Sequence, residues 1–189
     1  VKKLALNFES KTDAATADIH NCIEAVCTAC EQLSQTATGA LIVFERETKL
    51  GEQIDTGTII NATPSPELFG NIFFPNTPLH DGAVIIRDSK VYAAGCFLPK
   101  PQKEELISKA LGSRHRAAIG MSEVSDAVIV VVSEETGTIS IAENGSLTRF
   151  YNKDTLRKLL TAKLIPEKPE SKKLKDKASK KKKKNAPDA

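Results

Sequence analysis

The stretch LGSRHRAAIGMSEVSDAVIVVV, residues 111–132, contains two segments of different pattern in direct succession. Its last part, 126–132, is apolar after the first residue, and a strand without polar alternation is typical of a sheet covered on both faces. The preceding part, 113–124, places Ala, Ile and Met among charged residues and predicts a helix. A helix that leads into a buried strand indicates an α/β fold.

The residues before this stretch predict further helices and strands. Each is indicated by apolar spacing or by a cap. They are a helix over 12–35, strands over 39–44 and 58–62, a helix that Ser65 caps and Pro66 begins, and a hairpin of 83–86 with 91–94.

The residues after the stretch complete the prediction. Gly137 marks a turn into a strand over 138–142, and a final amphipathic helix covers 153–164. The fold class we expect is α/β, as a single domain with a central mixed β-sheet flanked by helices. The expected boundaries are an N-terminal linker over 1–14, the domain over 15–164 and a disordered Lys-rich tail over 165–189.

Charge is distributed unevenly along the chain. The formal net charge is +3, but residues 166–189 hold ten Lys and four acidic residues, which leaves a net charge of −3 for the rest. Domains that bind nucleic acid carry their basic residues on the fold, so we expect no nucleic acid partner for this domain. An alternative is that the tail itself binds RNA or an anionic membrane surface.

The cysteines do not suggest a metal site. Cys22, Cys27 and Cys30 lie on or near the apolar face of the first predicted helix, and Cys96 stands alone, so no second pair completes a zinc site. We expect buried, reduced thiols. No run of about 18 apolar residues occurs, so we expect no membrane span or signal peptide here, and Val1 in place of Met suggests a fragment.

Three cations begin the helix of the opening stretch. Arg114, His115 and Arg116 follow Ser113, the expected N-cap, and face the positive end of the helix dipole. A phosphate would offset this cost, because backbone N–H groups, the Ser113 hydroxyl and guanidinium groups all bind it. The alternatives are solvated charges or an Arg paired with a nearby Glu.

A second polar cluster stands directly before the predicted hairpin. His80, Asp81 and Gly82 precede an apolar strand, and a bend at Gly82 would aim the imidazole and the carboxylate at one divalent cation. Glu134 and Glu135 supply further carboxylates near a sheet edge, and Ser133 is placed to contact a phosphate. The sequence has no phosphate-binding loop, dinucleotide fingerprint or nucleophile elbow.

Together these motifs resemble the diadenylate cyclase (DAC, or DisA N-terminal) family. Asp81-Gly82-Ala83 and Arg114-His115-Arg116 carry the resemblance, which runs from about residue 15 to 160. GALIVFE, PLHDGAVII and the leading helix look most like the membrane-anchored, CdaA-type subfamily. The resemblance implies the condensation of two ATP into cyclic di-AMP with release of two pyrophosphates. The alternative is an inactive adenine-nucleotide sensor.

The resemblance also implies roles for individual residues. Asp81 would be the essential acid, and Gly82 would permit close approach of the nucleotide. The three residues that would bind the triphosphate are Arg114, His115 and Arg116. Phe97 and Leu98 would line the adenine site. The full set expected to bind ATP is Ile42, Gly82, Ala83, Phe97, Leu98, Gly112, Ser113, Arg114, His115, Arg116 and Ser133.

Cofactor and partners follow from the same resemblance. His80, Asp81 and Glu135 are the expected ligands of Mn²⁺ or Mg²⁺, with Co²⁺ as a third candidate ion and Glu134 as the alternative to Glu135. One domain binds one ATP, so catalysis would need a homodimer. The resemblance also implies two partners, a YbbR-domain regulator and phosphoglucosamine mutase. It further implies attachment to the cytoplasmic face of the cell membrane through a missing N-terminal segment.

Overall fold

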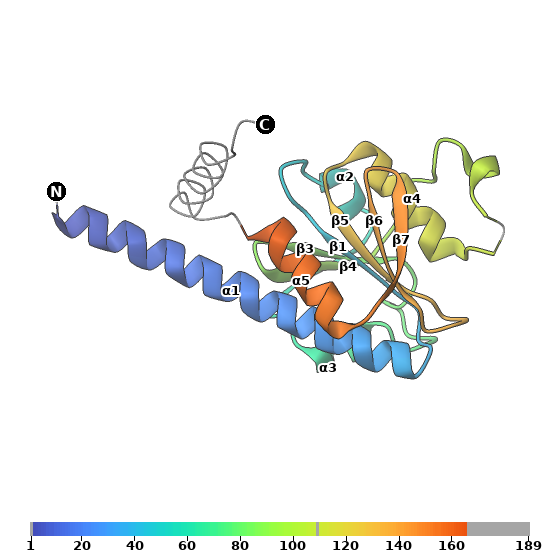
Figure 1. Ribbon diagram of the computed structural model, residues 1–189, viewed down its shortest axis with the longest axis horizontal. Helices are drawn as coiled ribbons and strands as arrows, with labels where there is room; N and C mark the ends of the chain where they lie inside the picture. Colours follow the sequence, from blue (N-terminus) through green and yellow to red (C-terminus); the bar gives the residue numbers. More distant parts are fainter. Residues whose placement is uncertain (1, 109, 166–189) are drawn as a thin grey trace, which may run out of the picture.

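A seven-stranded mixed sheet forms the centre of the computed structural model, which describes residues 2–108 and 110–165 (Figure 1). The strand order is β2-β4-β3-β1-β5-β6-β7. β1 runs parallel to β3, and the other neighbouring strands are antiparallel. The expected α/β class with a central mixed sheet is therefore confirmed.

The helices and strands of the described residues have the following bounds. They are α1 Lys2–Gln35, β1 Ala40–Phe44, α2 Gly51–Ile54, β2 Thr58–Ala62, α3 Pro66–Ile72, β3 Ala83–Arg87, β4 Lys90–Cys96, a 3₁₀ turn Glu104–Leu106, α4 Ser113–Val124, β5 Val128–Val132, β6 Ile139–Glu143, β7 Ser146–Tyr151 and α5 Lys153–Leu164.

Helices cover both faces of the sheet. α1, α3 and α5 pack on one face, where Ile42 of β1 and Val130 of β5 point. α2 and α4 cover the other face, which receives Val43 and Ile129 from the same strands. Every residue of β1 and β5 is buried, as expected for strands enclosed on both sides. The burial predicted for the strand over 126–132 is confirmed, since β5 lies inside the sheet between β1 and β6.

Most predicted elements agree with the structure, but two differ. α1 begins at Lys2 rather than near Thr12, so the segment expected as a linker is largely helical, and Figure 1 shows α1 projecting past the sheet. Sequence reasoning missed β7, which lies beside β6 at the edge of the described sheet and exposes most of its residues. An exposed edge strand lacks the apolar alternation by which strands are recognised.

The four cysteines are free and buried, and burial raises the pKa of Cys22 and of Cys27 to about 12. In the described part of the chain, no helix has the length and apolar content needed to cross a bilayer. The predicted Lys-rich tail lies outside the described residues except for Ile165.

Candidate active site

Both sequence clusters lie at one edge of the sheet. Because β1 is parallel to β3 and antiparallel to β5, the starts of β1 and β3 adjoin the end of β5. Gly39 precedes β1, Asp81 and Gly82 precede β3, and Ser133 follows β5. Strand direction therefore brings together residues that are far apart in the sequence.

Gly82 provides the bend that the sequence predicts before β3. Its φ is +108°, in the region that side chains disfavour, and a Cβ there would lie 2.7 Å from the carbonyl carbon of Gly95. The neighbouring strand β4 thus passes too close for any other residue. Asp81, next to this bend, is exposed.

The start of α4 differs in one detail from the prediction. Gly112, not Ser113, is the N-cap, and no side chain accepts a cap hydrogen bond there. Ser113 is the first residue of the helix, since helical geometry begins one residue earlier than a cap at Ser113 would imply, and its side chain is exposed. The first turn of α4 thus has no capping side chain.

Arg114 connects the two clusters. Its Nη1 pairs with Oε2 of Glu134 at 2.5 Å, and its Nη2 donates to the carbonyl oxygen of His80 at 3.3 Å. The Nε–H is buried and has no hydrogen-bond partner. One guanidinium therefore joins the loop before β3 to the loop after β5, while its Nε–H makes no hydrogen bond.

Gly39 makes room for this arrangement. A Cβ on Gly39 would lie 2.7 Å from Nη1 of Arg114 and 3.0 Å from Cβ of Glu134. A Cβ contact shorter than 3.0 Å requires a neighbouring atom to shift, so a larger residue would displace the end of the Arg114 side chain. Neither Gly39 nor the role of Glu134 as the partner of Arg114 was predicted as part of the site. The Arg–Glu pair was weighed only as an alternative to phosphate binding.

His115 and Arg116 occupy different surroundings. His115 is buried, and its Nε2 has no hydrogen-bond partner. Burial, with a further contribution from Arg149, lowers its pKa and favours the neutral imidazole, although Glu135 acts in the opposite direction. Arg116 turns away toward the loop before α4: it donates to the carbonyl oxygens of Leu111 and Ser108 and lies 3.5 Å from Glu104.

A small cleft gathers the predicted phosphate side. It is lined by the start of α4 and by the residues that follow β5, namely Gly112, Ser113, Arg114, His115, Val132, Ser133, Glu134 and Glu135. The hydroxyl of Ser133 accepts from the N–H groups of Glu135 and Thr136, which orders this loop. Arg116, in contrast, does not line the cleft.

The residues predicted to bind metal are only partly assembled. Nδ1–H of His80 donates to the carbonyl oxygen of Thr77 at 2.6 Å, which leaves Nε2 as the nitrogen with a free lone pair, the usual arrangement of a ligating imidazole. Among the described residues, however, no three His, Cys, Asp or Glu side chains are grouped closely enough to hold an ion. Glu134 is engaged by Arg114.

The remaining predicted ATP-binding residues fall into two groups. Phe97 is 64% exposed, directly after β4, and Leu98 is half-buried beside it. Ile42 and Ala83 are fully buried in the core, on opposite faces of the sheet. The structure therefore offers Phe97 to a ligand but encloses the side chain of Ile42 under α1.

The comparison with protein families identifies this arrangement. Residues 27–147 match the family described as DAC, DisA bacterial checkpoint controller nucleotide-binding. The chain belongs to the DAC family. The matched range contains every DAC site residue predicted above.

Curated relatives of the DAC domain are similar over much of the chain. Cyclic di-AMP synthase CdaA of Bacillus subtilis is 49% identical over 140 residues, which cover 74% of this chain and 51% of that protein. A diadenylate cyclase of Listeria monocytogenes is 44% identical over 146 residues, covering 77% of this chain and 53% of the relative. The chain thus spans about half the length of these proteins.

A solved structure supports the same assignment. A double mutant of DacA from Staphylococcus aureus superposes with a TM-score of 0.74 at 46% identity, covering 77% of this chain and 96% of that one. A hypothetical membrane-spanning protein from Bacillus cereus gives a TM-score of 0.64 at 47% identity, covering 67% and 62%. The sheet and helices described here are therefore those of the DAC fold.

Proposed function

We propose that this DAC domain is a diadenylate cyclase, which condenses two ATP into 3′,5′-linked cyclic di-AMP and releases two pyrophosphates. The observation that carries the proposal is the link through Arg114, which joins the Asp81 loop to the cleft formed by α4 and the loop after β5. Relatives that are 44–49% identical carry the names diadenylate cyclase and cyclic di-AMP synthase.

The triphosphate would bind at the start of α4. The uncapped first turn offers backbone N–H groups and the positive end of the helix dipole, and Ser113 adds an exposed hydroxyl. The guanidinium of Arg114, which lines the cleft, supplies positive charge. Arg116 would support the phosphates indirectly, since it fixes the loop that leads into Gly112.

Asp81 would promote attack by the ribose 3′-hydroxyl. Its carboxylate is exposed beside the bend at Gly82, where a nucleotide can approach the backbone closely. Phe97, with a largely exposed ring, would stack on the adenine. Positioning and charge neutralisation are what phosphoryl transfer chiefly requires of a protein.

The side chains at this edge fit a divalent ion that the substrate completes. Mg²⁺ is usually held by one or two carboxylates together with substrate phosphates, so a preformed group of three protein ligands is not needed. Nε2 of His80 and the carboxylate of Asp81 would be the ligands, with Glu135 closing the site after ATP binds. Such an ion lowers the pKa of a hydroxyl and neutralises phosphate charge.

Catalysis would require two copies of the domain. The product contains two new phosphodiester bonds, and each domain holds one ATP, so two sites must meet with each ribose aimed at the α-phosphate of the other nucleotide. The exposed positions of Asp81 and Phe97 suit an active centre completed by a second subunit. The YbbR-domain regulator, phosphoglucosamine mutase and membrane attachment stay predictions from the family resemblance.

A product assay tests the proposal. The protein is incubated with ATP and Mn²⁺, and cyclic di-AMP is measured by mass spectrometry. We expect product to accumulate together with pyrophosphate. Binding of ATP without any product, over a wide range of protein concentrations, would instead support a nucleotide sensor and refute the cyclase.

A further inference from the structure

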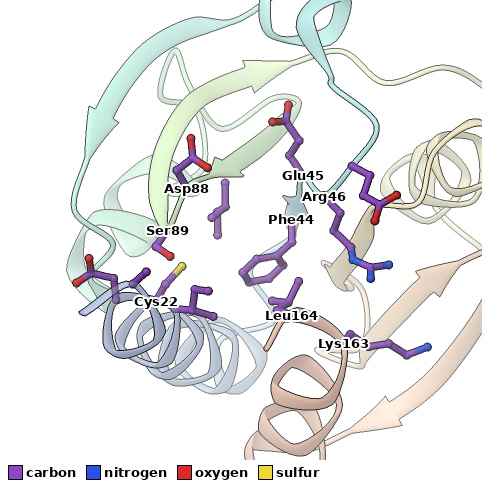
Figure 2. Close-up of a pocket in the computed structure, with 13 residues that line it drawn as sticks. Cys22, Phe44, Glu45, Arg46, Asp88, Ser89, Lys163 and Leu164 are labelled. Atoms are coloured by element: carbon purple, nitrogen blue, oxygen red, sulfur yellow. The ribbon is translucent and has the colours of Figure 1, made fainter. Parts of the chain in front are cut away.

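A second and larger cavity lies at the opposite end of the strands from the candidate active site. It has a volume of about 490 Å³ and opens between α1, the ends of β1 and β3, the β3–β4 turn and the last turn of α5 (Figure 2). Interiors of proteins rarely leave voids much larger than a water molecule, whereas ligand sites commonly occupy about 300–1,000 Å³. The cavity is therefore large enough for a small organic ligand.

The floor of this cavity is apolar. Figure 2 shows Cys22 of α1, Phe44 at the end of β1 and Leu164 of α5 around it, and Ile19 and Ile86 complete the lining. Cys22 is only 3% exposed, and because burial raises its pKa to about 12, its thiol stays protonated. The floor would accept a ring or a short aliphatic chain, and it offers no charge.

The basic residues at this cavity already have partners. Nζ of Lys163 pairs with Glu143 at 2.9 Å, and Figure 2 shows its side chain pointing away from the cavity. Nη1 of Arg46 donates to the backbone carbonyl of Asp126. Lys163 is therefore turned away from the cavity, and Arg46 is directed in part toward Asp126.

The acidic residues at the cavity are paired less completely. Glu45 is fully engaged by Arg87 and by other donors. In contrast, Asp18, Glu47 and Asp88 make no side-chain hydrogen bond or ion pair within the described part of the chain. A bound cation would supply the hydrogen-bond donors and the positive charge that these carboxylates lack.

We propose that this cavity binds an amphipathic organic cation, an ammonium or guanidinium group carried on an apolar ring or chain. The apolar part would lie against Cys22, Phe44 and Leu164, and the cation would lie between Asp18 and Asp88. An ammonium group has three donors and can bridge carboxylates on two elements. The proposal does not rest on the cyclase function, because the cavity shares no residue with the cleft at α4.

Two probes of matched shape test the charge requirement. Tryptamine carries an ammonium on an indole, and tryptophol carries a neutral hydroxyl on the same ring. Each is titrated into the protein, residues 1–189, at low ionic strength while the amide shifts of Cys22, Asp88 and Ser89 are followed by NMR. We expect tryptamine to shift these amides and to bind at least about tenfold more tightly, because hydrogen bonds to charged groups are the stronger ones.

A variant tests the residues. In Asp18→Asn/Asp88→Asn, tryptamine affinity should fall to that of tryptophol, while tryptophol binding stays unchanged. The matched control is Asp55→Asn, an exposed residue outside the cavity, which should leave both affinities unaltered. Three results would each overturn the proposal. They are equal affinity of the two probes for the unmodified protein, amide shifts confined to residues 112–135, and no amide shift at millimolar tryptamine.

Discussion

At the scale of single residues, Arg114 is the centre of the candidate active site. It reaches Glu134 and the carbonyl of His80, and Gly39 leaves the space in which it lies. The nearby Asp81 has a different character, since it is exposed beside a bend that only glycine allows. Substitutions at Asp81 and Gly39 should therefore affect catalysis and phosphate binding separately.

Replacing the carboxylate of Asp81 tests its chemical role. Asp81→Asn should abolish cyclic di-AMP synthesis while keeping the fold and most of the affinity for ATP, because the side chain is exposed and supports no packing. Activity is measured by mass spectrometry and folding by thermal unfolding. The control is Asp88→Asn, the same change at the other end of β3, which should keep activity. An unfolded Asp81→Asn protein would show that Asp81 is structural instead.

A methyl group at Gly39 tests the placement of Arg114. Gly39→Ala should raise the KM for ATP at least about tenfold, since the new Cβ displaces a guanidinium that would otherwise make charged hydrogen bonds to phosphate. Initial rates over a range of ATP concentrations give KM and kcat. Gly51→Ala is the control, because a Cβ there meets nothing within 4 Å. Unchanged kinetics in Gly39→Ala would mean that the position of Arg114 is unimportant for ATP.

At the scale of elements, Glu45 joins the end of β1 to its neighbours. Its carboxylate accepts two hydrogen bonds from Arg87 of β3, at 2.8 and 2.7 Å, and one from the N–H of Leu50 before α2. Burial alone would raise its pKa, but hydrogen bonds from Arg87, Leu50 and Lys49 outweigh burial and lower the pKa to about 2. This end of the sheet is thus held by a buried ion pair.

Glu45→Gln should lower the free energy of unfolding at pH 7 by about 2–4 kcal/mol, because Arg87 loses the charge that its partial burial requires. The folded-state pKa lies below that of the unfolded state, so the stabilisation by Glu45 is present above about pH 4.5 and is lost as pH falls toward 2. The difference in free energy of unfolding between the unmodified protein and Glu45→Gln should therefore become smaller as the pH falls toward 2. Urea unfolding at several pH values measures it.

The control for this experiment is Glu52→Gln, an exposed residue of α2, which should change stability by less than about 0.5 kcal/mol. A difference between the unmodified protein and Glu45→Gln that stays constant from pH 7 to pH 2.5 would show that the carboxylate charge contributes nothing. The effect would then come from side-chain shape alone.

At the scale of the whole molecule, the proposed reaction requires two domains. Specific cyclase activity should rise with protein concentration and reach a plateau, because the fraction of paired domains increases with concentration. Initial rates over a wide range of protein concentrations, with sedimentation of the same samples, check this. Specific activity that is independent of concentration in samples that sediment as monomers would contradict a centre shared between subunits.

The sequence by itself determined most of the local structure. The bounds of α4 and α5, the apolar β5 and the Ser65 cap of α3 follow from spacing and capping within a few residues. The same local patterns indicated Asp81-Gly82 and the Arg-His-Arg run as the candidate site. The edge strand β7 was missed, since exposed residues carry little periodicity.

Only the tertiary structure decided how these pieces combine. Strand direction and order bring Gly39, Asp81 and Ser133 to one edge, and the fold pairs Arg114 with Glu134 while turning Arg116 away. It also buries Ile42 and forms the cavity between α1 and α5 that is lined in part by Asp18 and Asp88. Spacing and caps act within a few residues, whereas each of these outcomes depends on contacts between segments distant in the sequence, which no local pattern records.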